Sequence, residues 1–217
     1  SLKKAHIGIA MQSGSAATRG VADMVLLNDS FAALPKAFME GQRILNGMDA
    51  IIRLFLSRAF YAAMILIGSA LMLGAVNFPF IPKHASLLTL LSVGIPTLGI
   101  AAWARVGVPT RNLMRDIIHF ILPSAMSIAG VALSVYVIFF HLHVYPSTPE
   151  LADVALNYAR TALTTAIIFM GLGLIVFVEP PIRFLAGGSN FSGDWRPTIS
   201  AGVMLGIYIL LVLIEPT

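Results

Sequence analysis

The sequence predicts a mainly α-helical membrane bundle of about five spans, preceded by an incomplete α/β unit and a stalk helix. Hydrophobic residues make up 58% of the 217 residues and charged residues only 11%, against about 25% charged in soluble domains. Several uncharged runs are long enough to cross a bilayer. The first fifty residues differ, since they hold acidic and basic side chains between two short apolar runs.

Residues 1–30 carry the pattern of an α/β unit. The runs 7–11 and 24–27 are strand-length and bounded by turn residues, and residues 15–22 between them favour a short helix. Strand, helix and strand in this order predict the edge of a parallel sheet. Two strands do not make a stable domain alone, so we expect this piece to pack on residues outside the chain or to be the remainder of a larger domain.

Residues 31–57 are expected to form the stalk helix. Residues 28–30 offer an N-cap, and Phe31, Leu34 and Phe38 begin an apolar series at helical spacing. Pro35 falls in the first turns, where proline is tolerated best. With no strong breaker until Gly47, the helix is predicted to run into the first span.

A membrane region is predicted over residues 58–217, with spans near 58–77, 85–104, 117–140, 160–179 and 197–215. Arg58 lies near the end of the first span and is expected to snorkel to the interface. Lys and Arg concentrate in cytoplasmic loops. The more basic side also carries the N-terminal piece, which predicts an integral, plasma-membrane protein with a cytoplasmic N-terminal side. The basic residues of that side are Arg105, Arg111, Arg115, Arg183 and Arg196, against Lys83 and Arg160 opposite.

The second span holds the residues with most chemical content. Pro96 cannot donate to the carbonyl of Ser92, and its ring crowds that turn, while Gly94 loosens it. A broken turn at membrane depth exposes carbonyl oxygens, which suit cations and are tolerated where they line a cavity or are buried in protein. Thr89 and Thr97 add hydroxyl groups. These five residues are the transport-path candidates, and a plain proline kink is the alternative interpretation.

Composition excludes several other functions. Without cysteine the chain has no disulfide framework, thiolate metal site or cysteine nucleophile. Its net charge is +4, but the basic residues flank apolar runs instead of clustering with aromatics on one face, so nucleic-acid binding is not expected. The sequence shows no nucleotide-binding P-loop. We therefore assign no catalytic, cofactor-binding or metal-binding residue to this chain.

Residues 2–57 resemble the cation-transporting P-type ATPases. The matching segments, in order, are residues 2–11, 14–19, 22–31, 40–44 and 52–57. In that family this stretch is the trailing edge of the phosphorylation domain, a HAD-like fold of Rossmann type, followed by the stalk helix into the fifth span. The second span here would be the sixth, with Gly94-Ile-Pro96 on the family's G-L-P element. The chain, which starts at Ser1 without a methionine, is interpreted as a C-terminal fragment.

The resemblance implies the membrane part of an ATP-driven pump, which couples aspartyl-phosphate chemistry in a missing upstream domain to cation transport. Mg and ATP would bind the full-length parent, and the fragment alone is not expected to hydrolyse ATP. Its partners would be the lipid bilayer and the missing N-terminal part of the same pump. A truncated non-catalytic membrane scaffold and a secondary transporter subunit are the alternatives.

The candidate site departs from the family pattern. Val93 stands where calcium and sodium/potassium pumps carry an acid, and Thr89 stands where they carry asparagine. Their fifth-span ligands fall near Ala59 and Ala62. The usual divalent-cation ligands are thus not reproduced, and the transported ion is not identified by the sequence.

Overall fold

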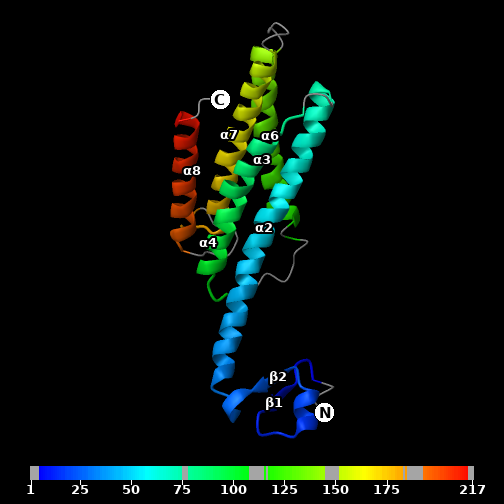
Figure 1. The fold of residues 1–217 in the computed structure, drawn as a ribbon, viewed down its shortest axis with the longest axis vertical. Coiled ribbons are helices and arrows are strands. Elements are labelled where there is room, and N and C mark those ends of the chain that lie inside the picture. The colour runs from blue at the N-terminus through cyan, green and yellow to red at the C-terminus, as the bar shows by residue number, and fades with distance from the viewer. Residues whose placement is uncertain are drawn as a thin grey trace.

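The protein is described here by a computed structural model, which covers residues 5–74, 78–107, 115, 117–144, 152–182, 184 and 193–214. A small α/β unit sits at one end of a very long helix, and a bundle of helices surrounds the other end (Figure 1). Arg111 and Arg183, used above to predict orientation, lie outside the described residues. We call the end of the bundle that lies away from the α/β unit the distal end.

The α/β unit consists of β1 (Ile9–Met11), α1 (Ala16–Gly20) and β2 (Met24–Leu26). The two strands pair in parallel with Ile9 opposite Met24, as the strand–helix–strand pattern predicted. Ser15 caps α1 by accepting a hydrogen bond from the Thr18 amide at 3.2 Å, which satisfies one of the free amides of the first turn. The Asp23 carboxylate accepts the Gly8 amide at 2.7 Å and so ties the two strands together.

Helix α2 (Ala33–Leu73) joins the α/β unit to the bundle in 41 residues, a length of about 60 Å at 1.5 Å per residue. The expectation of an N-cap at residues 28–30 is wrong. Asn28 and Asp29 adopt left-handed backbone angles, and the N-cap is Ala32, which makes no side-chain capping bond. The helix continues through Gly47, as predicted, since one glycine costs a helix only about 1 kcal/mol.

Together with the remaining helices, α2 makes up five candidate spans among the described residues, the number predicted from the sequence. Short π-helical segments join α3 to α4 and lie at both ends of α6. The elements are α3 (Pro82–Thr89), a π-helical segment Leu90–Gly94, α4 (Ile95–Trp103), a π-helical segment Ile117–Ile121, α6 (Leu122–Phe139), a π-helical segment Phe140–Val144, α7 (Ala152–Val178) and α8 (Arg196–Ile214).

The bundle core lies where α2, α6 and α7 meet. Helix α6 contributes Ala125, Ala129 and Ala132, all of which are buried. Small residues allow membrane helices to approach closely, and Ile65 of α2 and Ile167 of α7 fill the space beside them with no exposed surface. Helix α8 packs mainly on α7 and α4, at the side of the bundle (Figure 1). This packing fixes the position of α3 and α4, which carry the candidate site.

Candidate functional site

The helix of the second span is interrupted at the predicted place. Helix α3 ends at Thr89, the next five residues are π-helical, and α4 begins at Ile95. The Ile95 amide donates to the Leu90 carbonyl, five residues back. Because Pro96 has no amide hydrogen, it cannot close the following turn onto Ser92. The interruption is thus a widened turn, a feature often found at functional sites.

The three hydroxyl groups of the candidate site bond to carbonyls of their own helix. Thr89 Oγ1 donates to the Ala85 carbonyl at 2.7 Å, and Ser92 Oγ donates to the Leu88 carbonyl at 2.6 Å. Thr97 Oγ1 donates to the Gly94 carbonyl at 3.0 Å. A hydroxyl that donates in this way keeps its oxygen lone pairs for a cation or another donor. Ser92 Oγ and Thr97 Oγ1 therefore remain possible ligands, whereas Thr89 Oγ1 also accepts a hydrogen bond from Arg58.

The predicted residues divide between two environments. Ser92, Pro96 and Thr97 are buried, Gly94 is half-buried, and Thr89 is exposed. The structure therefore places Ser92, Pro96 and Thr97 inside the helix packing and Thr89 on an open face of α3.

Ser92 is held between two neighbouring helices. Its side chain interacts with the hydroxyl group of Tyr61 on α2. Gly171 of α7 is also near, since a Cβ atom placed on it would be in van der Waals contact with Ser92 Cβ at 3.4 Å. The widened turn is therefore in direct contact with both α2 and α7, so a movement of either helix acts on it.

Arg58 is the functional candidate that sequence reasoning missed. The snorkelling expected from its position stays a prediction, and the structure adds a contact that was not expected: the Nη2 atom of Arg58 donates to Thr89 Oγ1 at 2.6 Å. Arg58 and Thr89 lie on α2 and α3, and no local pattern predicts a contact between residues so far apart in the sequence. The only available signal was the rarity of arginine inside membrane spans, where ionisable residues are usually functional.

The described residues contain no group of three or more His, Cys, Asp or Glu side chains placed to hold a metal ion. The oxygens available near the widened turn are carbonyl and hydroxyl oxygens. Such neutral oxygens are ligands for hard cations, but calcium sites also use carboxylates. The arrangement can supply part of a cation site.

A second cluster of contacts anchors the other end of α4. Arg43 of α2 donates through Nε to the Ala104 carbonyl at 2.6 Å and through Nη2 to the Ala102 carbonyl at 2.7 Å. Asn46 Nδ2 donates to the Arg105 carbonyl at 3.2 Å. The last carbonyls of a helix have no partner within it, and basic side chains satisfy them well. We call Arg43 and Asn46 the α4 clamp.

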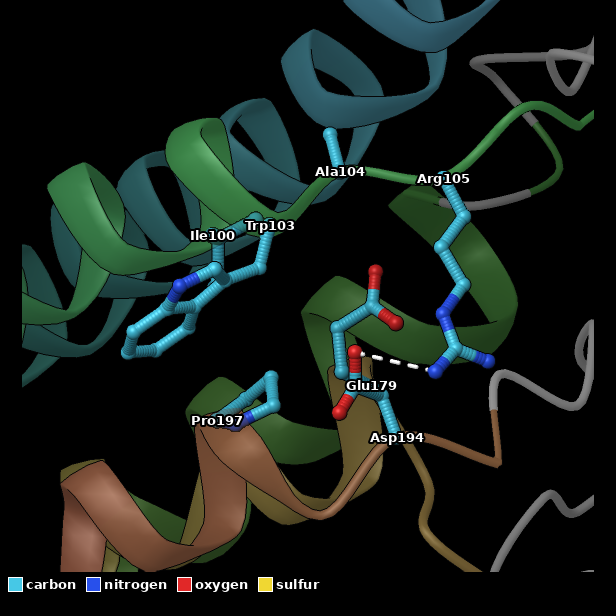
Figure 2. Close-up of a pocket in the computed structure, with 7 residues that line it drawn as sticks. All are labelled: Ile100, Trp103, Ala104, Arg105, Glu179, Asp194 and Pro197. Atoms are coloured by element: carbon cyan, nitrogen blue, oxygen red, sulfur yellow. Dashed lines mark ion pairs between the residues drawn. The ribbon is translucent and has the colours of Figure 1, made fainter.

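The segment after α4 is also tied to the start of α8. Figure 2 shows Arg105 reaching from this segment towards Asp194, beside Glu179 and Pro197. The Arg105 and Asp194 side chains form an ion pair with an N–O distance of 3.1 Å. Asp194 is buried, and its other carboxylate oxygen accepts the Arg196 amide at 3.0 Å at the first turn of α8. The end of α4 is therefore fixed to α2 on one side and to α8 on the other.

Comparison with known proteins gives several relatives that match nearly the whole chain. The calcium-transporting ATPase CtpE of Mycolicibacterium smegmatis is 28% identical over 218 residues, which cover 97% of this chain and 25% of that protein. CtpE of Mycobacterium tuberculosis is 31% identical over 230 residues, covering 99% and 23%. The probable cation-transporting ATPase exp7 of Streptococcus pneumoniae is 33% identical over 134 residues, covering 58% and 17%. No protein-family model matches the chain.

The chain spans about a quarter of the length of the calcium-transporting relatives. The similarity runs through the α/β unit, α2 and the bundle, since it covers 97% or more of the chain. It therefore concerns the same residues that build the widened turn and the α4 clamp.

Proposed function

The chain is homologous to calcium- and cation-transporting P-type ATPases over 97–99% of its length, and from this we propose that it is the C-terminal membrane part of an ATP-driven cation pump. Residues 1–30 would be the trailing edge of a HAD-like phosphorylation domain, residues 31–57 its stalk helix, and residues 58–217 the later spans. The phosphorylated aspartate, ATP and Mg would belong to upstream parts of the pump. This fragment would couple the phosphorylation of that aspartate to cation transport across the membrane.

The observation that carries the proposal is the widened turn in a chain with these relatives. A carbonyl-exposing interruption is tolerated at membrane depth only where protein or a cavity satisfies it. Here the turn carries Ser92, which interacts with Tyr61 of α2, the helix that leaves the bundle for the α/β unit. The same helix thus contacts the turn and extends to the proposed phosphorylation domain.

The relatives are named as calcium-transporting, so calcium is the first ion to test. The turn offers neutral oxygens, and the anionic ligands of a calcium site would come from spans outside this chain. Arg58 places a positive charge beside Thr89, which opposes cation binding on that face unless a carboxylate neutralises it. We therefore place the proposed path on the Ser92 side of the turn.

The proposed orientation puts the α/β unit and the α4 clamp in the cytoplasm, with the distal end outside the plasma membrane. Arg43, Arg105 and Arg196 lie at the same end of the bundle as the α/β unit, and the excess of basic residues on the cytoplasmic side supports this orientation.

The test uses the full-length pump reconstituted in vesicles. Pro96→Ala restores an amide that can bond to the Ser92 carbonyl and narrow the turn. We expect ATP-driven calcium uptake to fall about tenfold or more, since one restored hydrogen bond and the relief of proline crowding favour the closed helix by more than about 1.4 kcal/mol. The matched control is Pro123→Ala, because Pro123 also follows a π-helical segment but is exposed in the first turn of α6.

The outcome separates the candidate functions. Equal calcium uptake by Pro96→Ala and Pro123→Ala, at equal protein levels, would show that Pro96 only kinks the helix, and would contradict the proposed transport path. A gene that lacks an in-frame D-K-T-G upstream of this chain would exclude the pump and favour a membrane scaffold. Cation movement that persists without ATP would favour a secondary transporter.

A further inference from the structure

Arg58 carries a positive charge towards the middle of the helical bundle. Gly47 of α2 lies beside Ala104, at the end of the second span that holds the α4 clamp. Arg58 is eleven residues farther along α2, a rise of about 16 Å. Its partner Thr89 is the last of the eight residues of α3, which begin the 22-residue candidate span Pro82–Trp103. Since the hydrocarbon core is about 30 Å thick, the contact would lie well inside it.

No ion pair neutralises Arg58 within the part of the chain that the structure describes. Its Nη2 atom donates to the hydroxyl group of Thr89, which is a neutral acceptor, while Glu40, Asp49 and Asp194 pair with other arginines. The acidic residues of the sequence lie outside the predicted spans or at their ends. A carboxylate that neutralises Arg58 inside the membrane would therefore come from outside this chain.

The contact between Arg58 and Thr89 lies on an open face of α2 and α3. Thr89 is exposed, and Phe55 and Leu90, which flank the contact in sequence, are 52% and 56% exposed. Charged side chains at membrane depth usually face the interior of a bundle and pair there, because an unpaired charge against lipid is costly. Snorkelling would avoid this cost, whereas the hydrogen bond to Thr89 directs the guanidinium group to a neighbouring helix. The open face therefore favours a further span of protein over lipid.

We propose that an aspartate or glutamate in a membrane span upstream of this chain forms an ion pair with Arg58. The proposal rests on the proposed function, because it requires the earlier spans of a pump; this chain makes up only about a quarter of the calcium-transporting relatives. The guanidinium group has five N–H donors in a planar fork that fits both oxygens of a carboxylate, and the bond to Thr89 uses one of them. The pair would hold the upstream span against α2 and α3, beside the widened turn.

The test compares melting temperatures of variants of the full-length pump, purified in mild detergent. Arg58→Gln removes the charge but keeps a group that can donate to Thr89, and Arg58→Lys keeps the charge. Each acidic residue of the upstream spans is changed to its amide, alone and together with Arg58→Gln. The matched control is Thr89→Val, which removes the hydroxyl acceptor and leaves an ion pair with Arg58 in place.

We expect Arg58→Gln to lower the melting temperature by about 5 °C or more, because breaking a buried ion pair leaves the other charge uncompensated. Arg58→Lys and Thr89→Val should lower it less. One upstream acid, changed alone, should cause a similar fall, and its combination with Arg58→Gln should recover most of the loss, as for two residues in contact.

A crosslink measures the same proximity without relying on the stability of single variants. A pump with cysteine in place of both Arg58 and the identified acid leaves neither charge unpaired, so it is expected to fold. This chain has no cysteine of its own, and a short bifunctional thiol reagent should join the two positions. The same acid paired with a cysteine at Lys36, on the exposed part of α2, should give no crosslink.

Three results would overturn the proposal. The first is an unchanged melting temperature in Arg58→Gln, as expected if Arg58 snorkels to the interface. The second is a fall that no change of an upstream acid relieves, and the third is a set of upstream spans without an acidic residue. None of these results touches the proposed function, which is tested by calcium uptake in Pro96→Ala and by the upstream D-K-T-G.

Discussion

The close approach of α2 and α4 at Gly47 gives a sharp test of how α2 is joined to the helix that follows the widened turn. Gly47 is buried, and a Cβ atom placed on it would lie 2.8 Å from Ala104 Cβ. Ala104 caps the end of α4, and its Cβ is fixed directly to the backbone. Gly47→Ala therefore forces the two helices apart where the α4 clamp binds, because no flexible side chain can move away.

The size of the effect can be isolated with a second glycine of the same helix. A Cβ atom at Gly41 would meet no atom within 4 Å, so Gly41→Ala changes only helix propensity, a gain of about 0.8–1 kcal/mol. Gly47→Ala has the same gain but also overpacks the contact, which costs about 1–3 kcal/mol. The propensity gain cancels in the comparison, and the variants should differ by about 1–3 kcal/mol, or roughly 5- to 150-fold in an equilibrium constant.

Hydrogen exchange in the full-length pump measures this difference at the contact. The amides in the last turn of α4 should exchange about 5- to 150-fold faster in Gly47→Ala than in Gly41→Ala, since exchange reports local opening. The double variant Gly47→Ala with Ala104→Gly removes the clashing atom and should restore slow exchange. Equal exchange in the two single variants, or no rescue by Ala104→Gly, would show that α2 and α4 do not pack here as described.

Two other predictions concern hydrogen bonds outside the membrane core. Arg43→Ala removes two charged hydrogen bonds to the end of α4. Because the Arg43 side chain is 39% exposed, we expect a loss of only about 1–2 kcal/mol of local stability. The last turn of α4 should exchange its amide hydrogens faster, and less cation should move per ATP, whereas Lys36→Ala on the exposed part of α2 should change neither. The Ser13 amide donates to the Asp29 carboxylate at 3.0 Å, and this hydrogen bond lowers the pKa of Asp29 below its ordinary value of 3.8. A lowered folded-state pKa stabilises the turn above the ordinary pKa, and the stabilisation is lost as the pH falls through the folded-state pKa. The Ser13 amide signal should therefore titrate in this acidic range and should be insensitive to pH there in Asp29→Asn; a titration that persists in Asp29→Asn would contradict the assignment.

The elements that sequence analysis predicted are those that local pattern determines. An uncharged run long enough to cross a bilayer has no other stable fold in lipid, so the number of candidate spans followed from the runs alone. Pro96 likewise marked the interruption of the second span, because its missing amide acts within one turn. The strand–helix–strand unit followed from two short apolar runs and the turn residues beside them.

Contacts between residues far apart in the sequence could not be predicted from local pattern. Arg43 binds the end of α4 because α2 packs along α4, and Arg58 reaches Thr89 of α3 from the same helix. No spacing rule connects such pairs. The burial of His84, whose Nδ1 atom has no hydrogen-bond partner among the described residues, is equally a product of packing, since a histidine in the first turn of a span is usually expected to reach water. The N-cap of α2 was misplaced for a related reason: Asn28 and Asp29 have capping side chains, but the left-handed turn that they form delays the helix to Ala33.

The position of α4 gives the proposed coupling a physical route. Helix α4 begins at the widened turn and ends at the carbonyls bound by Arg43, a distance of about 14 Å for nine residues. A regular helix is stiff over such a length, whereas the turn before Pro96 lacks a backbone hydrogen bond and is the weakest point of the span. In the proposed coupling, a displacement of α2 that pulls on the α4 clamp would therefore be taken up at Ser92 and Gly94. Tyr61, on the same helix α2, interacts with Ser92, so α2 has contacts near both ends of α4. If α2 moved without changing the turn, the contact of Arg43 with α4 and the contact of Tyr61 with Ser92 would both have to break. Amide exchange would then become faster at the end of α4 and at the turn together, which would contradict this route.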